Sequence, residues 1–199
     1  GAIGGKVVMI TGASSGIGQA AAEKVAAAGA KVLLVARSAD KLEVIKEEIE
    51  AAGGEAYVHP CDLADVDDIE RMGKEVLEEH GHVDILVNNA GIIRRDDAIR
   101  FSEKDWDDVI DLNLKSVFFF SQAVARQYIA QDTGGRIINV ASMLSFQGGI
   151  RVPSYTASKS GVVGLTRLMA NEWAAHRINV NAIAPGYMAT NNTAPLRAD

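Results

Sequence analysis

Three polar residues have the types and spacing of a proton-transfer site. Ser142 follows an apolar run, Tyr155 comes thirteen residues later, and Lys159 lies four residues beyond it. Residues four apart share one face of a helix, so Tyr155 and Lys159 can point into one cleft. A free tyrosine has a pKa of about 10, and a nearby ammonium lowers it by favouring the phenolate. We expect Tyr155 to exchange a proton with a substrate oxygen that accepts a hydrogen bond from Ser142.

A glycine-rich loop near the N-terminus is typical of a dinucleotide-binding site. Residues 11–18 read Thr-Gly-Ala-Ser-Ser-Gly-Ile-Gly and lie between an apolar run and a helical pattern. Glycines let the backbone approach a pyrophosphate, and the following helix offers free N–H groups and a positive dipole end. Such a loop is a strong signal only where it opens a strand-helix-strand unit, as it does here. The expected cofactor contacts are Gly12, Ser14, Ser15, Gly16, Ile17 and Gly18.

Arg37 occupies the position that sets the choice between the two nicotinamide cofactors. It follows the second apolar run, where folds that prefer NAD usually carry an acid that binds the ribose 2′-hydroxyl. A guanidinium instead binds a 2′-phosphate through charge-assisted hydrogen bonds. We therefore expect NADP(H) to be preferred and NAD(H) to remain a second option. The alternative is that Arg37 is a solvated residue in front of a helix.

The framework that must hold these residues is an alternation of strands and helices. Strand, helix and strand in repeated order indicate parallel pairing through right-handed crossovers. We expect an α/β fold, a Rossmann-type doubly wound parallel sheet, in one NAD(P)-binding domain spanning residues 1–199. The six expected strands are Lys6–Thr11, Lys31–Ala36, Glu55–His59, Val83–Asn88, Gly135–Ala141 and Arg177–Ile183. The expected helices are Gly16–Ala28, Ala39–Ala52, Val66–His80, Glu103–Ala130 and Tyr155–Ala174.

Composition excludes several other classes of protein. The 199 residues are 48% hydrophobic with a net charge of −6, which suits a packed enzyme core and argues against a nucleic-acid partner. No apolar run is long enough for a membrane span, and residues 1–6 do not resemble a signal peptide, so we expect a cytoplasmic enzyme. Cys61 is the single cysteine and is interpreted as a structural thiol. The histidines lack metal-motif spacing and are interpreted as structural or solvated, with no metal site; they are His59, His80, His82 and His176.

The glycine loop, Ser142 and the Tyr-x-x-x-Lys motif occur in the order found in the short-chain dehydrogenase/reductase family, which the whole chain resembles. Further matching segments are 88–91 (Asn-Asn-Ala-Gly), 111–114 (Asp-Leu-Asn-Leu) and 179–186 (Asn-Val-Asn-Ala-Ile-Ala-Pro-Gly). The resemblance implies hydride transfer between NAD(P)(H) and a carbonyl or secondary alcohol. It also implies that Asn113 is a fourth catalytic residue, holding a water that relays protons through Lys159. The implied cofactor contacts are Asp62, Leu63, Asn89, Ala90, Gly91, Tyr155, Lys159, Pro185, Gly186 and Thr190.

A finer resemblance divides the chain in two. Residues 91–199 resemble bacterial dehydrogenases that interconvert 2-dehydro-3-deoxy-D-gluconate and its 5-keto form, whereas residues 1–90 resemble NADP-dependent ketoacyl or acyl reductases. A sugar acid carries a carboxylate, which arginines near the cleft can bind unless they pair with neighbouring acids instead. An acyl substrate needs an apolar slot. The arginines concerned are Arg94, Arg95 and Arg151, and the apolar side chains are Met143, Phe146, Ile150 and Met188.

The apolar run Phe118–Phe120 exceeds what one core-facing stripe of a helix needs and predicts a subunit interface. The resemblance implies a homodimer or homotetramer formed through the long helices. It also implies a C-terminal strand and helix that we expect to be absent from this chain, leaving the substrate side open. A dinucleotide-binding module, or an incomplete fragment with little turnover, is therefore a second hypothesis beside the enzyme.

Overall fold

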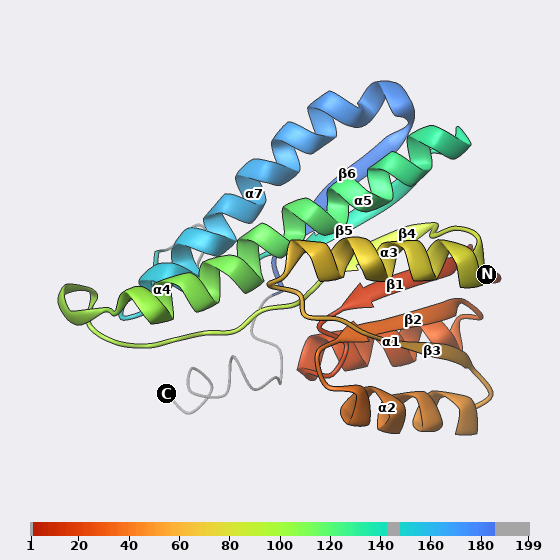
Figure 1. Cartoon of the computed structure of the whole chain (residues 1–199), viewed down its shortest axis with the longest axis horizontal. Coiled ribbons are helices and arrows are strands. Elements are labelled where there is room, and N and C mark those ends of the chain that lie inside the picture. Colours follow the sequence, from red (N-terminus) through yellow and green to blue (C-terminus); the bar gives the residue numbers. More distant parts are fainter. Residues whose placement is uncertain (1, 143–147, 186–199) are drawn as a thin grey trace.

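The computed structural model describes residues 2–142 and 148–185. Its strands form a six-stranded, entirely parallel sheet in the order β3-β2-β1-β4-β5-β6 (Figure 1). The order reverses between β1 and β4, which places a ligand crevice at the carboxyl ends of these two strands. The predicted doubly wound α/β fold is confirmed. The strands are β1 Val7–Thr11, β2 Lys31–Ala36, β3 Glu55–Pro60, β4 Ile85–Asn88, β5 Gly135–Val140 and β6 Ile178–Ile183.

Helices cover both faces of the sheet and each buries one apolar side. The first core cluster lies under α1 and α2, where alanines and branched aliphatic residues meet alternate residues of β1 and β2. The second lies under α3, α5 and α7, where larger side chains such as Phe120, Tyr128 and Met169 are fully buried. These helices are α1 Gly16–Ala27, α2 Ala39–Ala51, α3 Val66–His80, α4 Glu103–Ile110, α5 Ser116–Gln131 and α7 Pro153–Trp173.

The long helix expected over residues 103–130 is interrupted, which corrects the sequence prediction. Between α4 and α5 the chain makes a π-helical turn, Asp111–Lys115, which is wider than an α-helical turn. Asn113 lies in this turn with its side chain completely buried. Its Oδ1 accepts from the Ile92 N–H at 2.9 Å and its Nδ2 donates to the Ile92 carbonyl at 2.9 Å. These two hydrogen bonds to Ile92 stabilise the π-helical turn. π-helical turns are frequent at functional sites.

A buried polar network joins the middle of the sheet to the helices above it. Asn88 Nδ2 donates to Asn139 Oδ1 at 2.9 Å and to Ser121 Oγ at 3.1 Å, which connects β4 to β5 and α5. Asn139 Nδ2 in turn donates to Thr166 Oγ1 of α7 at 3.0 Å. Buried amides are costly without partners, so this network favours one register of strands and helices. It thereby fixes the strand ends that carry the site.

Two further sequence interpretations agree with the structure. Cys61 is buried, and this burial raises the pKa of its thiol to about 12, as expected for a structural cysteine. The acids after residue 61 begin a helix: Asp65 caps α3 by accepting from the N–H groups of Asp67 and Asp68. Within the described ranges, every helix is too short or too polar to cross a membrane.

Candidate active site

The glycine loop forms a close-packed cradle between β1 and α1. Gly12 has a φ of +64°, and a Cβ there would lie 2.6 Å from the Ala90 Cα, so only glycine fits. A Cβ on Gly18 would lie 2.2 Å from the Gly12 carbonyl oxygen. Ser15 is the N-cap of α1, but its hydroxyl donates to the Gly12 carbonyl at 3.1 Å and does not cap the helix. Ser15 thus leaves the first N–H groups of α1 uncapped, and such N–H groups suit a phosphate anion.

Thr11 ties this loop to the one that follows β4. Its Oγ1 accepts from the Asn89 N–H at 3.0 Å and from the Ala90 N–H at 3.2 Å. Asn89 also donates from Nδ2 to the Gly12 carbonyl at 3.3 Å. The two loops therefore form one rigid wall, and Thr11 is a positioning residue that the sequence analysis did not single out. The sequence feature that could have identified Thr11 is its position as the last residue of a strand, directly before the glycine loop.

A cavity of about 580 Å³ runs along this wall. It extends from the glycine loop past the end of β2 to Gly91 and the π-helical turn. Seven of the residues predicted to contact the cofactor line this cavity, and the cavity suits a flat, elongated, anionic ligand. The lining includes Gly12, Ser14, Ser15, Arg37, Ser38, Lys41, Leu63, Ala90, Gly91, Arg94 and Asp111.

The end of β2 provides a second place for an anion. Arg37 is exposed at the mouth of the cavity, and its Nη2 lies 3.5 Å from Asp62 Oδ1. Ser38 is the N-cap of α2 and makes no side-chain cap hydrogen bond, so its side chain also leaves this helix N-terminus uncapped. Lys41 lines the same cavity one helical turn later. Sequence reasoning found Arg37 and missed Lys41, although its spacing of four residues from Arg37 was visible.

Ser142, Tyr155 and Lys159 come together beside the ends of β5 and α7. Ser142 follows β5, and its side chain hydrogen-bonds that of Tyr155. Tyr155 and Lys159 lie one turn apart on α7, and both are buried. The Lys159 ammonium lies 5.8 Å from the centre of the Tyr155 ring and donates to the Val140 carbonyl at 3.1 Å. The predicted constellation is therefore assembled in space.

The protonation of this pair differs from the sequence prediction. Burial raises the pKa of Tyr155, although the hydrogen bond from Ser142 and the charge of Arg95 act to lower it. The expected lowering by Lys159 is wrong for this geometry, because its ammonium is directed to a main-chain carbonyl. Burial also lowers the pKa of Lys159 to about 8. Tyr155 is therefore a protonated donor at neutral pH, and Lys159 titrates close to neutrality.

Asn113 and Lys159 lie side by side behind Gly91, which lines the cavity. A Cβ on Gly91 would lie 3.4 Å from Lys159 Nζ and 3.6 Å from Asn113 Oδ1, so Gly91 lies directly beside both groups. The Asn113 amide is engaged with the main chain of Ile92, as described above. Asn113 is thus a positioning element that joins the π-helical turn to the loop after β4. The water relay implied by the family resemblance stays a prediction.

The three arginines considered for a substrate carboxylate differ in their partners. Arg151 forms an ion pair with Asp97 at 2.9 Å. Arg94 donates to the Ile93 carbonyl at 3.2 Å and lies 3.9 Å from Asp105. Arg95 is exposed, and within the described part of the chain it forms no ion pair within 4 Å. Its charge acts to lower the pKa of Tyr155. Arg94 is the one of the three that lines the cavity.

Some of the predicted residues remain to be placed. Ile17 and Pro185 line one hollow between α1 and the end of β6, so Pro185 lies beside the first turn of α1. Ile150 is 85% exposed, so it does not form part of a closed apolar slot. Gly186 and Thr190 lie outside the described residues, as do Met143, Phe146 and Met188.

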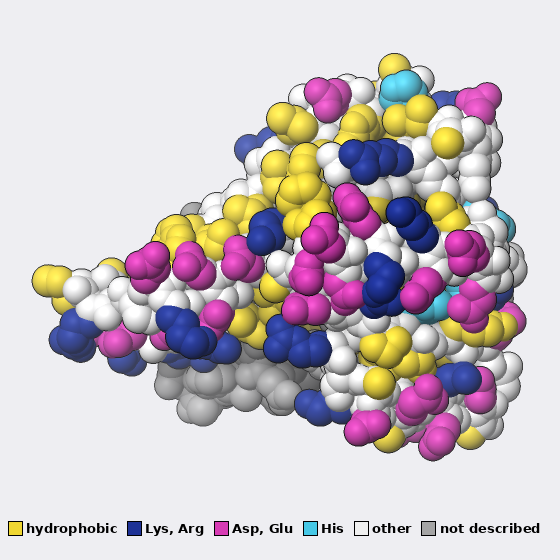
Figure 2. All heavy atoms as spheres, in the orientation of Figure 1, with side chains coloured by type: hydrophobic (Ala, Val, Ile, Leu, Met, Phe, Trp, Pro, Cys, Tyr) yellow, Lys and Arg dark blue, Asp and Glu magenta, His cyan; other side chains and the backbone are white. Residues whose placement is uncertain are grey.

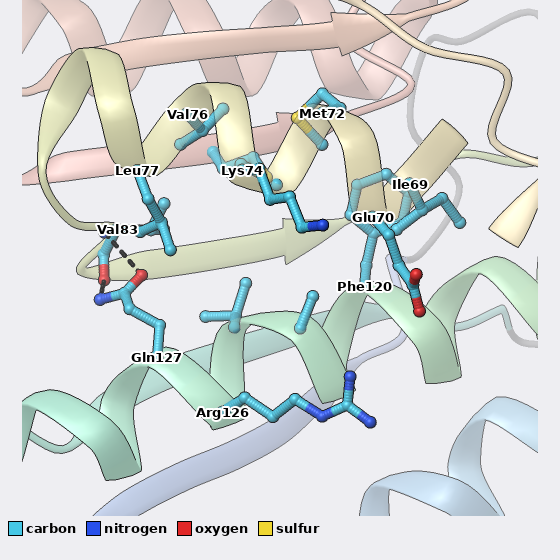
Figure 3. A pocket seen from close by; sticks show the side chains of 14 residues that line it. Ile69, Glu70, Met72, Lys74, Val76, Leu77, Val83, Phe120, Arg126 and Gln127 are labelled. Atoms are coloured by element: carbon cyan, nitrogen blue, oxygen red, sulfur yellow. Dashed lines mark hydrogen bonds between the residues drawn. The ribbon is translucent and has the colours of Figure 1, made fainter. Parts of the chain in front are cut away.

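A second hollow, of about 170 Å³, lies between α3 and α5 (Figure 3). Its walls are mainly apolar and include Met72, Val76 and Phe120. Gln127 points to one end, where its amide binds both main-chain groups of Val83. The polar side chains of this hollow are Glu70, Lys74, Arg126 and Gln127 (Figure 3), and no glycine-loop residue is among those that line it. The cavity at the carboxyl ends of the strands is therefore the candidate active site.

Comparisons with known proteins agree with this placement. A family model described as short chain dehydrogenase matches residues 6–199. The chain is 60% identical over 195 residues to 2-dehydro-3-deoxy-D-gluconate 5-dehydrogenase from Escherichia coli, covering 98% of this chain and 76% of that protein. It is 40% identical over 199 residues to 3-oxoacyl-[acyl-carrier-protein] reductase from a Synechocystis species, covering 100% of this chain and 80% of that protein. Both alignments run through both halves of the sequence.

Solved structures give the same result for the fold. A candidate 2-deoxy-D-gluconate 3-dehydrogenase from Agrobacterium tumefaciens, crystallised with bound NADP, is 54% identical to this chain. It superimposes with a TM-score of 0.89, covering 99% of this chain and 77% of the other. The similarity in sequence and in fold therefore extends over almost the entire chain.

Proposed function

The chain belongs to the short-chain dehydrogenase family, and we propose that it transfers hydride between NADP(H) and a carbonyl or secondary alcohol group of a keto-deoxy sugar acid. As a member of this family it is an oxidoreductase acting on CH–OH groups. One observation carries the proposal: the cavity that begins at the glycine-loop cradle reaches Gly91, and Gly91 lies directly beside Lys159 of the Ser142, Tyr155 and Lys159 constellation. The single domain spanning residues 1–199 is part of the same proposal.

Proton transfer is the task of Tyr155. Its raised pKa keeps the hydroxyl protonated at neutral pH, so it gives its proton to the carbonyl oxygen during reduction. Ser142 holds both the Tyr155 hydroxyl and the substrate oxygen. Lys159 has a pKa of about 8, below the raised pKa of Tyr155, so passing a proton from its ammonium to the Tyr155 phenolate is favourable. Oxidation runs the same steps in reverse, and NADP(H), when bound, supplies or accepts the hydride.

The fit for NADP(H) rests on two free helix N-termini and the cations beside one of them. The N-terminus of α1 faces the cavity beneath Gly12 and Ser15 and suits the pyrophosphate. Arg37 and Lys41 stand at the N-terminus of α2, where a 2′-phosphate would be neutralised by two charges. The Arg37–Asp62 pair is long and exposed, so it leaves the guanidinium available to a stronger anion. The NADP-bound Agrobacterium relative supports this choice.

A sugar acid is favoured over an acyl substrate because of Arg95. This exposed cation is close enough to the tyrosine to lower its pKa, and a carboxylate bound there would bring a neighbouring carbonyl toward Tyr155. The 60% identity to the Escherichia coli sugar-acid dehydrogenase points in the same direction, against 40% for the acyl-carrier-protein reductase. We expect Arg95→Gln to raise KM for a keto-deoxy sugar acid at least tenfold, whereas Arg151→Gln, which removes an arginine already paired with Asp97, changes it little.

A spectrophotometric screen of NADPH consumption tests the function. We expect turnover with keto-deoxy sugar acids, weaker turnover with β-ketoacyl substrates, and loss of both in Tyr155→Phe. Cofactor binding is measured in parallel by NADPH fluorescence. NADPH binding without turnover of any substrate, unchanged by Tyr155→Phe, would instead establish a binding module.

The quaternary structure that we propose is a homodimer or homotetramer formed through α5 and α7. Hydrophobic side chains gather over these two helices on the molecular surface (Figure 2). Leu168 of α7 is 51% exposed and Ile129 of α5 is 43% exposed, while Phe118 and Phe119 are only partly buried. Light scattering of the wild-type protein and of Leu168→Glu tests the interface, since the variant should shift the mass toward the monomer.

A further inference from the structure

Two histidines from different elements meet beneath the edge of the sheet. His59 belongs to β3 and His80 is the last residue of α3, and their Nε2 atoms are 2.9 Å apart. The His59 side chain is 6% exposed and that of His80 is 1% exposed. Glu79 approaches both rings: one carboxylate oxygen lies 3.8 Å from His59 Nε2 and the other lies 3.8 Å from His80 Nε2. Neither β3 nor α3 contributes a proton-transfer residue.

One hydrogen bond accounts for the approach of the two rings but not for that of Glu79. The two imidazoles can share one N–H···N bond, but at 3.8 Å the Glu79 oxygens are beyond hydrogen-bond distance of either ring. His80 Nδ1 is buried and has no hydrogen-bond partner among residues 2–142 and 148–185, so within them the pair leaves one ring nitrogen unsatisfied in either tautomer. Three atoms of metal-ligand type thus lie within 4.8 Å of one another with only one hydrogen bond between them.

We propose that His59, Glu79 and His80 form a binding site for a divalent transition-metal ion of the Zn²⁺ class. Two imidazoles and a carboxylate are ligands that zinc accepts, with a water in the fourth position. Tetrahedral bonds of about 2.0–2.1 Å place two nitrogen ligands about 3.4 Å apart. The rings therefore have to separate by roughly half an ångström. One Glu79 oxygen has to approach both nitrogens, and because the three ligand atoms now span up to 4.8 Å, it has to move by about 1.4 Å. The Glu79 side chain is 53% exposed and can make this adjustment while a water enters beside it.

The surroundings favour a cation held by neutral imidazoles. Burial lowers the pKa of both histidines, so their ring nitrogens keep lone pairs at neutral pH. Glu75 and Glu79 act on His59, and Glu55 and Glu79 act on His80, each carboxylate favouring positive charge. Lys31 is the opposing charge; its ammonium lies over the Tyr57 ring, which packs edge-on against His80. Carboxylates thus outnumber the cation around the site.

Such an ion would act as a structural link. β3 is an edge strand of the sheet, and the ion would join its end to the last turn of α3. The three ligands come from positions 59, 79 and 80, so the site exists only in the folded chain. Binding therefore stabilises the fold, and this effect is separate from hydride transfer.

The test uses tag-free protein that has been treated with a chelator and dialysed. Zn²⁺ is added in equilibrium dialysis with metal analysis, Co²⁺ is added as a spectroscopic probe, and Tm is followed with and without Zn²⁺. We expect one equivalent of Zn²⁺ per chain, a visible Co²⁺ spectrum typical of four-coordinate nitrogen and oxygen ligation, and a higher Tm with Zn²⁺.

Three variants identify the ligands. Glu79→Gln changes an exposed side chain and should fold normally, yet weaken Zn²⁺ binding at least tenfold; His80→Asn should abolish it. His82→Asn is the matched control, because His82 lies nearby but is 47% exposed and contacts Asp84 instead, and it should bind like the wild type. The proposal is overturned if the wild type binds no Zn²⁺ at micromolar concentration, or if Glu79→Gln binds it as tightly as the wild type. If His80→Asn fails to fold, the Glu79→Gln result alone decides.

Discussion

Replacing Lys159 with methionine should reveal what a buried ammonium costs this fold. The pKa of Lys159 falls from 10.5 to about 8 because the side chain is buried. At 1.36 kcal/mol for each pKa unit, the charged form is destabilised by about 3 kcal/mol relative to the unfolded chain. Methionine has nearly the same length and carries no charge. At neutral pH, Lys159→Met loses a hydrogen bond but also removes this cost. Its free energy of unfolding should therefore be higher than the loss of the hydrogen bond alone predicts, although the variant should lack activity.

The decisive quantity is the pH dependence of the difference in unfolding free energy. Between pH 8 and 10.5 the unfolded wild-type chain keeps a proton on Lys159 that the folded chain has released, so wild-type stability rises with pH in this window. The energetic cost of burying the charged ammonium is fully present below pH 8 and is gone above pH 10.5. Between pH 7 and pH 10, the free energy of unfolding of the wild type should thus rise by about 2.5 kcal/mol relative to that of Lys159→Met.

Guanidinium unfolding followed by circular dichroism at several pH values measures this difference. The lost hydrogen bond to Val140 should contribute nearly equally at each pH, so only the slope reports the buried charge. Lys24→Met, at an exposed position on α1, is the control and should show no slope. A constant difference between wild type and Lys159→Met from pH 7 to pH 10 would refute the reasoning.

Three other variants and one pH profile follow from the site. Tyr155→Phe should lower kcat by at least about a thousandfold, since the proton donor is lost; a residual rate within tenfold of wild type would contradict the assignment. Because the pKa of Tyr155 is raised and that of Lys159 is about 8, reduction should decline above pH 8 while oxidation rises, as initial rates in both directions would reveal. Arg37→Ala with Lys41→Ala should reduce the preference for NADPH over NADH about tenfold to a hundredfold, judged from kcat/KM, in proportion to two charge-assisted contacts. Gly12→Ala should lose about 2 kcal/mol of stability and most NADPH affinity, because its Cβ would meet the Ala90 main chain at a positive φ.

The sheet and its flanking helices were predictable because their signals are local. The continuous apolar runs of β1 and β2 identify strands buried on both faces, and the structure buries every residue of β1. The glycine loop was equally readable, since Gly12 and Gly18 are required by contacts within a few ångströms of the backbone. These features depend on short stretches of chain.

The features that sequence reasoning missed are set by contacts between distant segments. The π-helical turn at Asp111–Lys115 depends on Asn113 pairing with Ile92, and five residues are too few to distinguish one helical period from another. The pKa of Tyr155 depends on burial and on the direction of the Lys159 ammonium, which no spacing encodes. His59 and His80 are 21 residues apart and match no metal motif, so only the packing of α3 on β3 could bring them together.

The π-helical turn has a consequence for how this chain can tolerate insertions and deletions. Such a turn holds one more residue than an α-helical turn, so deleting one residue from Asp111–Lys115 would convert the region into a continuous helix. The faces of α4 and α5 would keep their orientation, and Phe120 and Tyr128 would still reach the core. A deletion elsewhere in α5 would instead turn every following side chain by about 100° and unpack that face. A chain that lacks one residue of the π-helical turn could therefore fold normally. It would still lack the site, because Asn113 would no longer be positioned beside Ile92.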